Sequence, residues 1–221
     1  MKKLLLAFFL FFSYSTAEDS TKKYLNYLQN LPTKTKKYRF YKLLLPPIKK
    51  VHNDLEKLYL QVKNNIEKRK NLSYLNKLKK QYKAKSYNEL LKKIKPHPIS
   101  ITLAQAAMES GWGTSRFFVE ANNIFGMWSK SKEGAIQAAQ TRQNGKTIHL
   151  KRYNNLEEAI EAYYLNIARN SAYKKFQDIK FVSNDPYELV GYLDNYSEKK
   201  DLYTVELIKV IYYNTMTKYD I

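Results

Sequence analysis

Residues 101–115 read ITLAQAAMESGWGTS and are followed closely by NNIFG at 122–126. Small and apolar residues recur at helical spacing along the first stretch, which predicts a helix. Ser100 can cap its start, and Gly111 can adopt the left-handed conformation that ends it. Glu109 then lies in the last turn, where the negative end of the helix dipole and apolar neighbours raise the pKa of its carboxyl group. A carboxyl group prepared in this way is suited to act as a general acid.

The alternative is an ordinary solvated glutamate at a helix end. Against it, Gly111, Gly113 and Gly126 place three of the chain's six glycines around one carboxylate, which favours a built cleft. The string AMESGWG followed by NNIFG resembles the bacterial glucosaminidase family, the wall hydrolases that include the flagellar-rod muralytic domain and the Bax-like proteins. This resemblance implies a mostly helical, lysozyme-like domain with a small β-hairpin lobe, preceded by N-terminal helices.

The N-terminus predicts a secretory signal. Two lysines precede the apolar run 4–12, and small residues follow at 15–17. Signal peptidase reads this pattern, so residues 1–17 are expected to be removed. The run is too short for a permanent membrane anchor, and no later segment reads as transmembrane. We therefore expect an exported protein of the periplasm or cell envelope.

The composition indicates one sizeable core beneath a basic surface. The 221 residues include 39 Lys and Arg against 20 Asp and Glu, for a net charge of +19, and no cysteine. Disulfides, thiolate metal sites, a cysteine nucleophile and a lipid-modified cysteine are thereby excluded. The charge favours an anionic partner, and because no nucleic-acid motif is present we expect cell-wall polymer or an envelope surface instead. Alternatively, the lysines simply solvate helix faces. We expect a monomer.

Residues 18–95 are expected to form a helical region that packs on a catalytic domain at 96–221. Apolar residues at steps of three and four over 48–66 predict one helix, with Pro46-Pro47 in its first turn. His97 follows in a basic, proline-punctuated junction, where a surface loop residue is the expected interpretation.

The stretch 135–152 predicts a β-hairpin with Asn144-Gly145 as its turn. In the resembled family this region is a β-lobe beside the cleft, and some members carry a second catalytic carboxylate there. Arg142 occupies the corresponding position here. Glu133 is the carboxylate that remains between Trp128 and the hairpin, so it is the candidate for that second role.

A further helix is predicted after the hairpin, with Asn155 as its cap and Glu158 completing a capping box. The resemblance, carried here by an aromatic approach followed by N-x-E-E-A, implies an active-site tyrosine at Tyr153. Its phenol could bind an N-acetyl group or hold a water molecule, and the alternative is a hairpin-edge tyrosine that packs on the sheet. The resemblance continues through most of the remaining chain, where Tyr196 and Tyr203 either line the cleft or pack in the core.

Together these features predict an exported β-N-acetylglucosaminidase that cuts peptidoglycan between N-acetylglucosamine and N-acetylmuramic acid. Glu109 would be the general acid, and either the substrate's own N-acetyl oxygen or a distant base would complete the reaction. The histidines lack ligand spacing and no phosphate loop is present, so we expect no metal and no cofactor. The expected catalytic residues are Glu109, Tyr153 and Glu133, and the expected substrate-binding residues are Ser110, Trp112, Asn122, Asn123, Phe125 and Gly126.

Two other functions are compatible with the sequence. A lytic transglycosylase or muramidase also uses a Glu-Ser pair at a helix end, but such enzymes typically continue with a Gly-Leu-Met-Gln-like element that is missing here. A non-catalytic wall-binding protein that kept the cleft would explain the missing second carboxylate. The products of the reaction would separate these alternatives.

Overall fold

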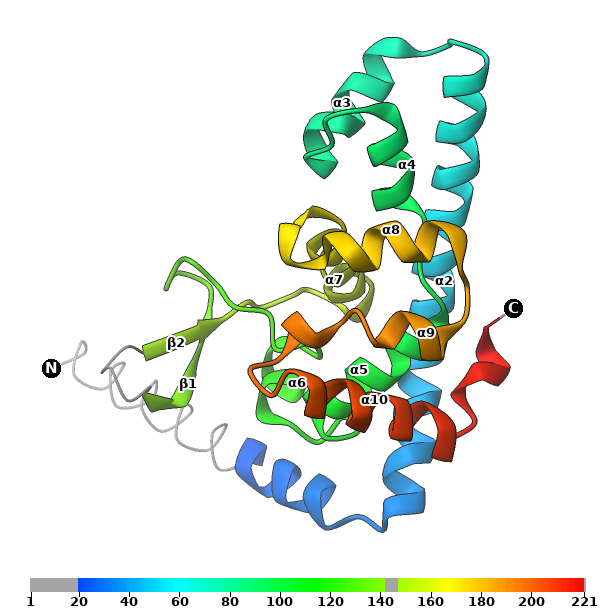
Figure 1. The fold of residues 1–221 in the computed structure, drawn as a ribbon. Coiled ribbons are helices and arrows are strands. Elements are labelled where there is room, and N and C mark those ends of the chain that lie inside the picture. The colour runs from blue at the N-terminus through cyan, green and yellow to red at the C-terminus, as the bar shows by residue number, and fades with distance from the viewer. Residues whose placement is uncertain (1–19, 142–146, 221) are drawn as a thin grey trace, which may run out of the picture.

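The computed structural model describes residues 20–141 and 147–220 (Figure 1). Its elements in chain order are a helix over 20–30, α2 (Thr33–Glu67), α3 (Leu72–Tyr82), α4 (Tyr87–Ile94), α5 (Ile99–Ser110), α6 (Arg116–Ala121), β1 (Ile136–Thr141), β2 (Thr147–Leu150), α7 (Leu156–Arg169), η1 (Ser171–Tyr173), α8 (Lys174–Val182), α9 (Pro186–Val190), η2 (Asp194–Tyr196), α10 (Asp201–Tyr213) and η3 (Met216–Tyr219). The prediction of a mostly helical fold with a small β-hairpin is confirmed. The expected signal segment 1–17, Arg142 and the turn Asn144-Gly145 lie outside the described residues.

The 35-residue helix α2 connects two packed regions of the molecule. Its first half buries Phe40, Leu44 and Ile48 in the main core, and its second half buries Val62 in a smaller core with α3 and α4. The helix begins at Thr33, so the prediction that Pro46-Pro47 occupy a first turn is wrong. Proline removes a hydrogen bond from a helix interior, and burial of apolar side chains on both sides of the pair offsets this loss.

Helix α5 lies at the centre of the main core. It buries every residue from Ile99 to Ala107 and packs against α2, α9, α10 and η3. A helix that is apolar on all sides requires neighbours on all sides, and the small side chains of Ala104, Ala106 and Ala107 let those neighbours approach closely. This packing fixes the position of the C-terminal end of α5, where Glu109 lies.

The N-terminal end of α5 differs from the prediction. The helix begins at Ile99, and Ser100 is not its cap. Instead, the Ser100 amide and hydroxyl donate hydrogen bonds of 2.7 and 2.5 Å to the carboxylate of Asp220, which follows η3. A carboxylate from the far end of the chain therefore accepts the free donors of the first turn, an arrangement that local spacing does not reveal.

The β-hairpin forms a small lobe beside α6. β1 and β2 are antiparallel, with Ile136 opposite Leu150 and an irregularity between Gln137 and Thr141. Ile136 and Leu150 pack on Ala121 of α6, which attaches the lobe to the helical body. Among the described residues, no helix combines the length and apolarity needed to cross a membrane.

Candidate active site at the end of helix α5

A tight turn ends α5 immediately after Glu109. Gly111 has the left-handed conformation that the sequence predicts (φ 57°), and Trp112 continues it with φ 60°. A bulky residue rarely adopts this conformation, so the surroundings must hold it. The Trp112 amide donates to Ala107 (2.8 Å), while the Ser110 hydroxyl donates to Ala106 (2.6 Å) and accepts from the Gly113 amide (2.8 Å). These bonds account for the buried Ser110 hydroxyl, which therefore shapes the turn.

The Glu109 side chain is exposed to solvent, yet its carboxyl group is crowded by protein atoms. Desolvation by this surrounding protein raises its pKa to about 7, against opposing effects of a hydrogen bond from Tyr203 and the positive charge of Lys199. A Cβ atom at Gly126 would lie 3.7 Å from Oε2 of Glu109, so Gly126 borders the carboxyl group directly. The group is therefore open to solvent on one side and desolvated on the other.

Tyr203 of α10 connects Glu109 to a buried hydrogen-bond chain. Its hydroxyl bonds to Glu109 and accepts a bond of 2.9 Å from Nε2 of Gln105. Gln105 Oε1 in turn accepts a short hydrogen bond from the hydroxyl of Tyr163 on α7, and that hydroxyl lies 3.0 Å from Nε2 of His97. Gln105 and Glu109 are four residues apart, so both project from the same face of α5.

The directions of these bonds follow from proton counting. Tyr163 has one hydroxyl proton and donates it to Gln105, so its bond with His97 requires a proton on Nε2 of the histidine. Likewise, Tyr203 accepts from Gln105 and therefore donates its proton to Glu109. Every donor in the chain thus points toward the Glu109 carboxylate, which favours its ionised form and limits how far burial raises its pKa.

His97 is 1% exposed and lies at the opposite end of this chain. The prediction of a surface loop residue is therefore wrong. Besides Tyr163, Nε2 of His97 contacts Thr102 Oγ1 at 3.0 Å. Burial, followed by the positive charge of Lys180, holds the pKa of His97 well below its ordinary value, so the ring is neutral. His97 lies between Pro96 and Pro98, which are also buried, directly before α5. The lysines and prolines of this segment are typical of a surface loop, which is why the sequence predicted one.

Tyrosines of the C-terminal half surround Glu109. The rings of Tyr196 and Tyr203 stack at 5.6 Å, and Tyr173 packs beside Tyr196 at 6.2 Å. Burial raises the pKa of all three hydroxyls, and the Glu109 charge raises them further. These tyrosines remain protonated donors at neutral pH, arranged around one carboxyl group.

The loop after α6 has a structural role in this fold. Asn123 is buried, and its Nδ2 donates to the carbonyls of Met127 (2.9 Å) and Lys151 (2.8 Å) while its Oδ1 accepts from the Met127 amide. Asn122 adopts a left-handed conformation and donates to the Tyr153 carbonyl at 3.0 Å. Both side-chain amides thus join the loop to the strand that leaves the hairpin. The predicted contacts of these two residues with sugar acetamido groups remain predictions.

The two aromatic residues predicted to stack on sugars lie in different surroundings. Phe125 is buried and stacks on Tyr163 with ring centroids 4.1 Å apart. Trp112 is partly exposed, packs edge-on against Phe40 and Tyr41 of α2, and borders a cavity of about 190 Å³. Phe125 therefore packs against Tyr163 of the tyrosine cluster (Tyr163, Tyr173, Tyr196 and Tyr203). Trp112 holds the turn after Glu109 against α2.

The structure does not bring the other two predicted catalytic residues into recorded contact with Glu109. Tyr153 is buried, and its hydroxyl has no hydrogen-bond partner among the residues that the structure describes. Desolvation followed by the Glu158 charge raises its pKa to about 12. Glu133 is exposed in the turn before β1, with its amide bonded to Ser131. Within the described part of the chain, no carboxylate contributes to the Glu109 pKa shift.

Sequence analysis missed Gln105, and it named Tyr203 only as a residue that lines the cleft or packs in the core, without its bonds to Gln105 and Glu109. Gln105 lies four residues before Glu109 on a helix that is otherwise apolar or small, and a lone buried amide in that position requires a partner. The sequence could therefore have predicted that Gln105 has a hydrogen-bond partner. It could not identify that partner, because Tyr203 lies 98 residues away. Over the ranges 20–141 and 147–220, no three His, Asp or Glu side chains gather to hold a metal ion.

Comparison with known proteins places this site in a family. The glucosaminidase family model, described as mannosyl-glycoprotein endo-beta-N-acetylglucosaminidase, matches residues 84–216. Over 91 residues the chain is 34% identical to protein bax of Escherichia coli K12, a match that covers 41% of this chain and 31% of that protein.

Solved structures also align with this chain. The catalytic domain of the autolysin Auto from Listeria monocytogenes aligns with a TM-score of 0.48 and 19% identity, over 67% of this chain and 86% of that domain. The glycoside hydrolase domain of FlgJ from Salmonella typhimurium aligns with a TM-score of 0.42 and 22% identity, over 55% and 77% of the two chains. The family model covers more than half of the 221 residues, including α5 and the tyrosine cluster, so the chain belongs to the glucosaminidase family and is a glycosidase.

Proposed function

We propose that the protein hydrolyses the β-1,4 bond that follows N-acetylglucosamine in peptidoglycan strands, with Glu109 as the general acid. The observation that carries this proposal is the Glu109 carboxyl group, which is open to solvent and has a pKa of about 7. An acid with a pKa near the working pH combines a populated protonated form with a ready proton transfer. Family membership supports the proposed bond type, since the family model is described as a mannosyl-glycoprotein endo-beta-N-acetylglucosaminidase.

In this mechanism, protonated Glu109 donates its proton to the glycosidic oxygen, and the bond between that oxygen and the anomeric carbon breaks. Tyr203 holds the carboxyl group in place and stabilises the carboxylate that remains, because its hydroxyl already donates to Glu109. Gln105 positions Tyr203 from behind. Desolvation favours the acid before the transfer, and the hydrogen bond favours the carboxylate after it.

The second chemical group is proposed to come from the substrate. The causes of the raised Glu109 pKa include no carboxylate among the described residues, and neither Tyr153 nor Glu133 has a recorded hydrogen bond to Glu109. In the proposed reaction, the N-acetyl oxygen of the N-acetylglucosamine whose glycosidic bond is cleaved attacks the anomeric carbon of that sugar and forms a cyclic oxazolinium ion. Ionised Glu109 then takes a proton from water, the resulting hydroxide equivalent adds to the anomeric carbon, and the N-acetyl group is restored.

Tyr153 is proposed to contact the acetamido group or the attacking water. Its buried hydroxyl has no partner within residues 20–141 and 147–220, and buried polar groups without a partner are rare in folded proteins. Trp112, at the turn beside Glu109, is proposed to contact a sugar ring. Glu133 is retained as a proposed base for the inverting alternative.

Peptidoglycan is proposed as the substrate because of the sequence resemblance to Bax-like proteins, the expected export signal and the charge of +19. A basic protein in the cell envelope would gather at an anionic wall. We accordingly propose that the protein acts in the periplasm or elsewhere in the envelope.

The test is digestion of purified peptidoglycan by the chain from Glu18 onward, followed by borohydride reduction and mass spectrometry. The proposal predicts fragments that end in reduced N-acetylglucosamine, formed by the wild type and by a Glu67→Gln control but not by Glu109→Gln. Glu67 is an exposed residue at the end of α2. Fragments that end in anhydromuramic acid or reduced muramic acid would instead establish a lytic transglycosylase or a muramidase. Wall binding without fragments would establish a binding protein.

A further inference from the structure

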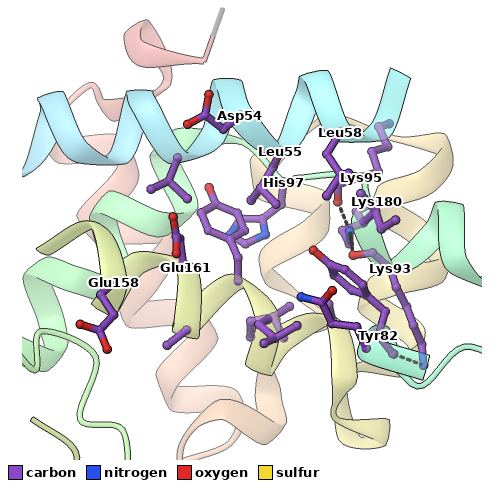
Figure 2. Close-up of a pocket in the computed structure, with 18 residues that line it drawn as sticks. Asp54, Leu55, Leu58, Tyr82, Lys93, Lys95, His97, Glu158, Glu161 and Lys180 are labelled. Carbon is purple, nitrogen blue, oxygen red and sulfur yellow. Dashed lines mark hydrogen bonds between the residues drawn. The ribbon is translucent and has the colours of Figure 1, made fainter. Parts of the chain in front are cut away.

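A second cavity lies away from Glu109, between the N-terminal helices and the body of the protein (Figure 2). Its walls come from α2, α3, α4, α7 and α8, and its volume is about 380 Å³. Pockets of this size typically bind small molecules when apolar walls are combined with a few polar groups. Leu55 and Leu58 of α2 and Leu165 of α7 supply the apolar walls here.

One end of this cavity carries two lysine ammonium groups, whose nearest acidic influence is the charge of Glu56. Lys180 is 2% exposed, and its Nζ donates to the carbonyl oxygens of Lys93 and Lys95. In the described part of the chain, neither Lys180 nor Lys95 forms an ion pair. Burial, together with the like charge of Lys95, lowers the pKa of Lys180 to about 7 against the opposing charge of Glu56. A buried ammonium group that forms no ion pair is costly, and an anion placed beside it would relieve that cost.

Tyr82 adds an unused donor at the same end. The residue is 6% exposed, and its hydroxyl forms no hydrogen bond with any other residue that the structure describes, although the oxygen is not fully enclosed. Figure 2 shows this hydroxyl directed toward the middle of the cavity, on the side of Lys180. A protonated phenol and two ammonium groups together form a binding site for a carboxylate.

The opposite end of the cavity is acidic. Glu161 of α7 lines it and makes no hydrogen bond or ion pair within the described ranges, and Asp54 lines it from α2. In Figure 2, Glu161 lies between α2 and α7, across the apolar middle from Lys180. Its charge reaches into the cavity, since it contributes to the raised pKa of Tyr82. Glu161 also acts on the charge of Lys50 but forms no ion pair with it, so its carboxylate suits an ammonium group at this place.

We propose that this cavity binds a small zwitterion, an amino acid or short peptide, with its carboxylate at Lys180, Lys95 and Tyr82 and its ammonium group at Glu161. The apolar part of the ligand lies against the leucines between the two ends. Both charged groups of such a ligand find partners that form no ion pair among the described residues. The cavity shares His97 with the hydrogen-bond chain but does not include Glu109, and its test does not require turnover.

The experiment is isothermal titration calorimetry of the whole chain with 6-aminohexanoate and with alanylalanine as probes. Hexanoate, which lacks the ammonium group, and hexylamine, which lacks the carboxylate, are the matched controls. We expect at least one zwitterion to bind about tenfold more tightly than either control, because each lost charge contact costs about that factor. Equal binding of hexanoate or hexylamine, or no binding of either zwitterion up to about 10 mM, would overturn the proposal.

Three variants locate the binding. Glu161→Gln is expected to weaken the zwitterion about tenfold and leave hexanoate unchanged. Tyr82→Phe is expected to weaken both, and it removes only one oxygen, so the fold is retained. Glu67→Gln, outside the cavity, is expected to change neither. Tight zwitterion binding that survives both Glu161→Gln and Tyr82→Phe would place the ligand elsewhere and sink this assignment.

Discussion

Glu109 and His97 occupy the two ends of one hydrogen-bond chain through Gln105, and burial acts on them in opposite directions. Desolvation raises the pKa of Glu109 to about 7 and holds that of His97 well below its ordinary value. Near pH 7 His97 is therefore neutral, while Glu109 is present in both its protonated and its ionised form. They differ in access, because Glu109 is exposed to solvent and His97 is 1% exposed.

This difference shows that a shifted pKa alone does not identify a catalytic group. His97 is desolvated more completely than Glu109, yet its contacts with Thr102 and Tyr163 are internal to the protein. Its role is to hold the chain that ends at Tyr203. Of these two groups, Glu109 is the one that lies where solvent can reach it, which is why we propose Glu109 and not His97 as the proton donor.

The largest effect is expected for Glu109→Gln. Removal of the general acid should lower kcat by about a thousandfold. Circular dichroism and thermal unfolding should show an unchanged fold, because the side chain lies at an exposed helix end. Steady-state turnover of wall fragments measures the loss, with Glu67→Gln as the control. A loss of less than about tenfold would remove Glu109 from the proposed role.

The same variant should also change the pH dependence of stability. In the wild type, the raised pKa means that the protonated carboxyl group stabilises the fold at low pH and that this contribution is lost as the pH rises through about 7. Glutamine stays neutral, so above pH 8 the variant should be the more stable protein, by about 1 kcal/mol after allowance for solvent screening. Chemical denaturation at pH 5 and at pH 9 measures the difference, and an identical difference at the two values would contradict the shift.

His97→Ala sharpens the comparison from the buried end. The variant leaves a cavity and removes a partner from Thr102 and Tyr163, so the free energy of unfolding should fall by about 3 kcal/mol. Turnover per folded molecule should stay within about threefold of the wild type, because the chain only positions Tyr203. Urea unfolding and kinetics below the melting temperature test the two parts separately. A thousandfold loss of kcat with an intact fold would break the comparison.

Tyr153→Phe tests whether the unpaired hydroxyl serves the substrate. We expect kcat/KM to fall about tenfold, the typical value of one lost hydrogen bond to a reacting group. The melting temperature should not fall, since the change removes a buried hydroxyl that has no partner in the protein. Tyr38→Phe on the exposed face of α2 is the matched control. Unchanged kcat/KM would assign Tyr153 to packing alone.

The smallest effect is expected for Tyr203→Phe, which removes a hydrogen bond that lowers the pKa of Glu109. Activity requires protonated Glu109, so kcat/KM is highest below its pKa and falls as the pH rises through it. The variant should move this alkaline limb upward by less than about one pH unit. Tyr212→Phe, exposed on the same helix, should leave the limb in place. A downward shift would show that Tyr203 does not stabilise the carboxylate.

The sequence predicted those parts of the site that depend on local spacing. The end of α5 at Gly111, the cap of α7 by Asn155, and the two-stranded hairpin are all confirmed. Each follows from residues that lie within a few positions of one another. The Asn155 side chain accepts from the Glu158 amide as predicted, but the capping box does not form, because the Glu158 carboxylate accepts from the amide of Asn154 and not from that of Asn155.

The sequence did not predict features that depend on distant partners. Asp220 replaces Ser100 at the start of α5 from 120 residues away, and Tyr203 reaches Gln105 across 98 residues. His97 lies in a segment whose lysines and prolines are typical of a loop, while tertiary packing buries it. Spacing along the chain carries no record of such contacts, which arise only when α5 is enclosed on every side.

The most direct test of the central claim is the titration of the Glu109 carboxyl group itself. Carbon-13 NMR of protein labelled at the glutamate side-chain carboxyl, compared with Glu109→Gln, identifies the one resonance that the variant lacks. We predict that this resonance titrates with a midpoint near the value of about 7 given by its desolvation. A midpoint near the ordinary glutamate value of about 4.3 would contradict the account, because the group would then be ionised at neutral pH and could not serve as the acid.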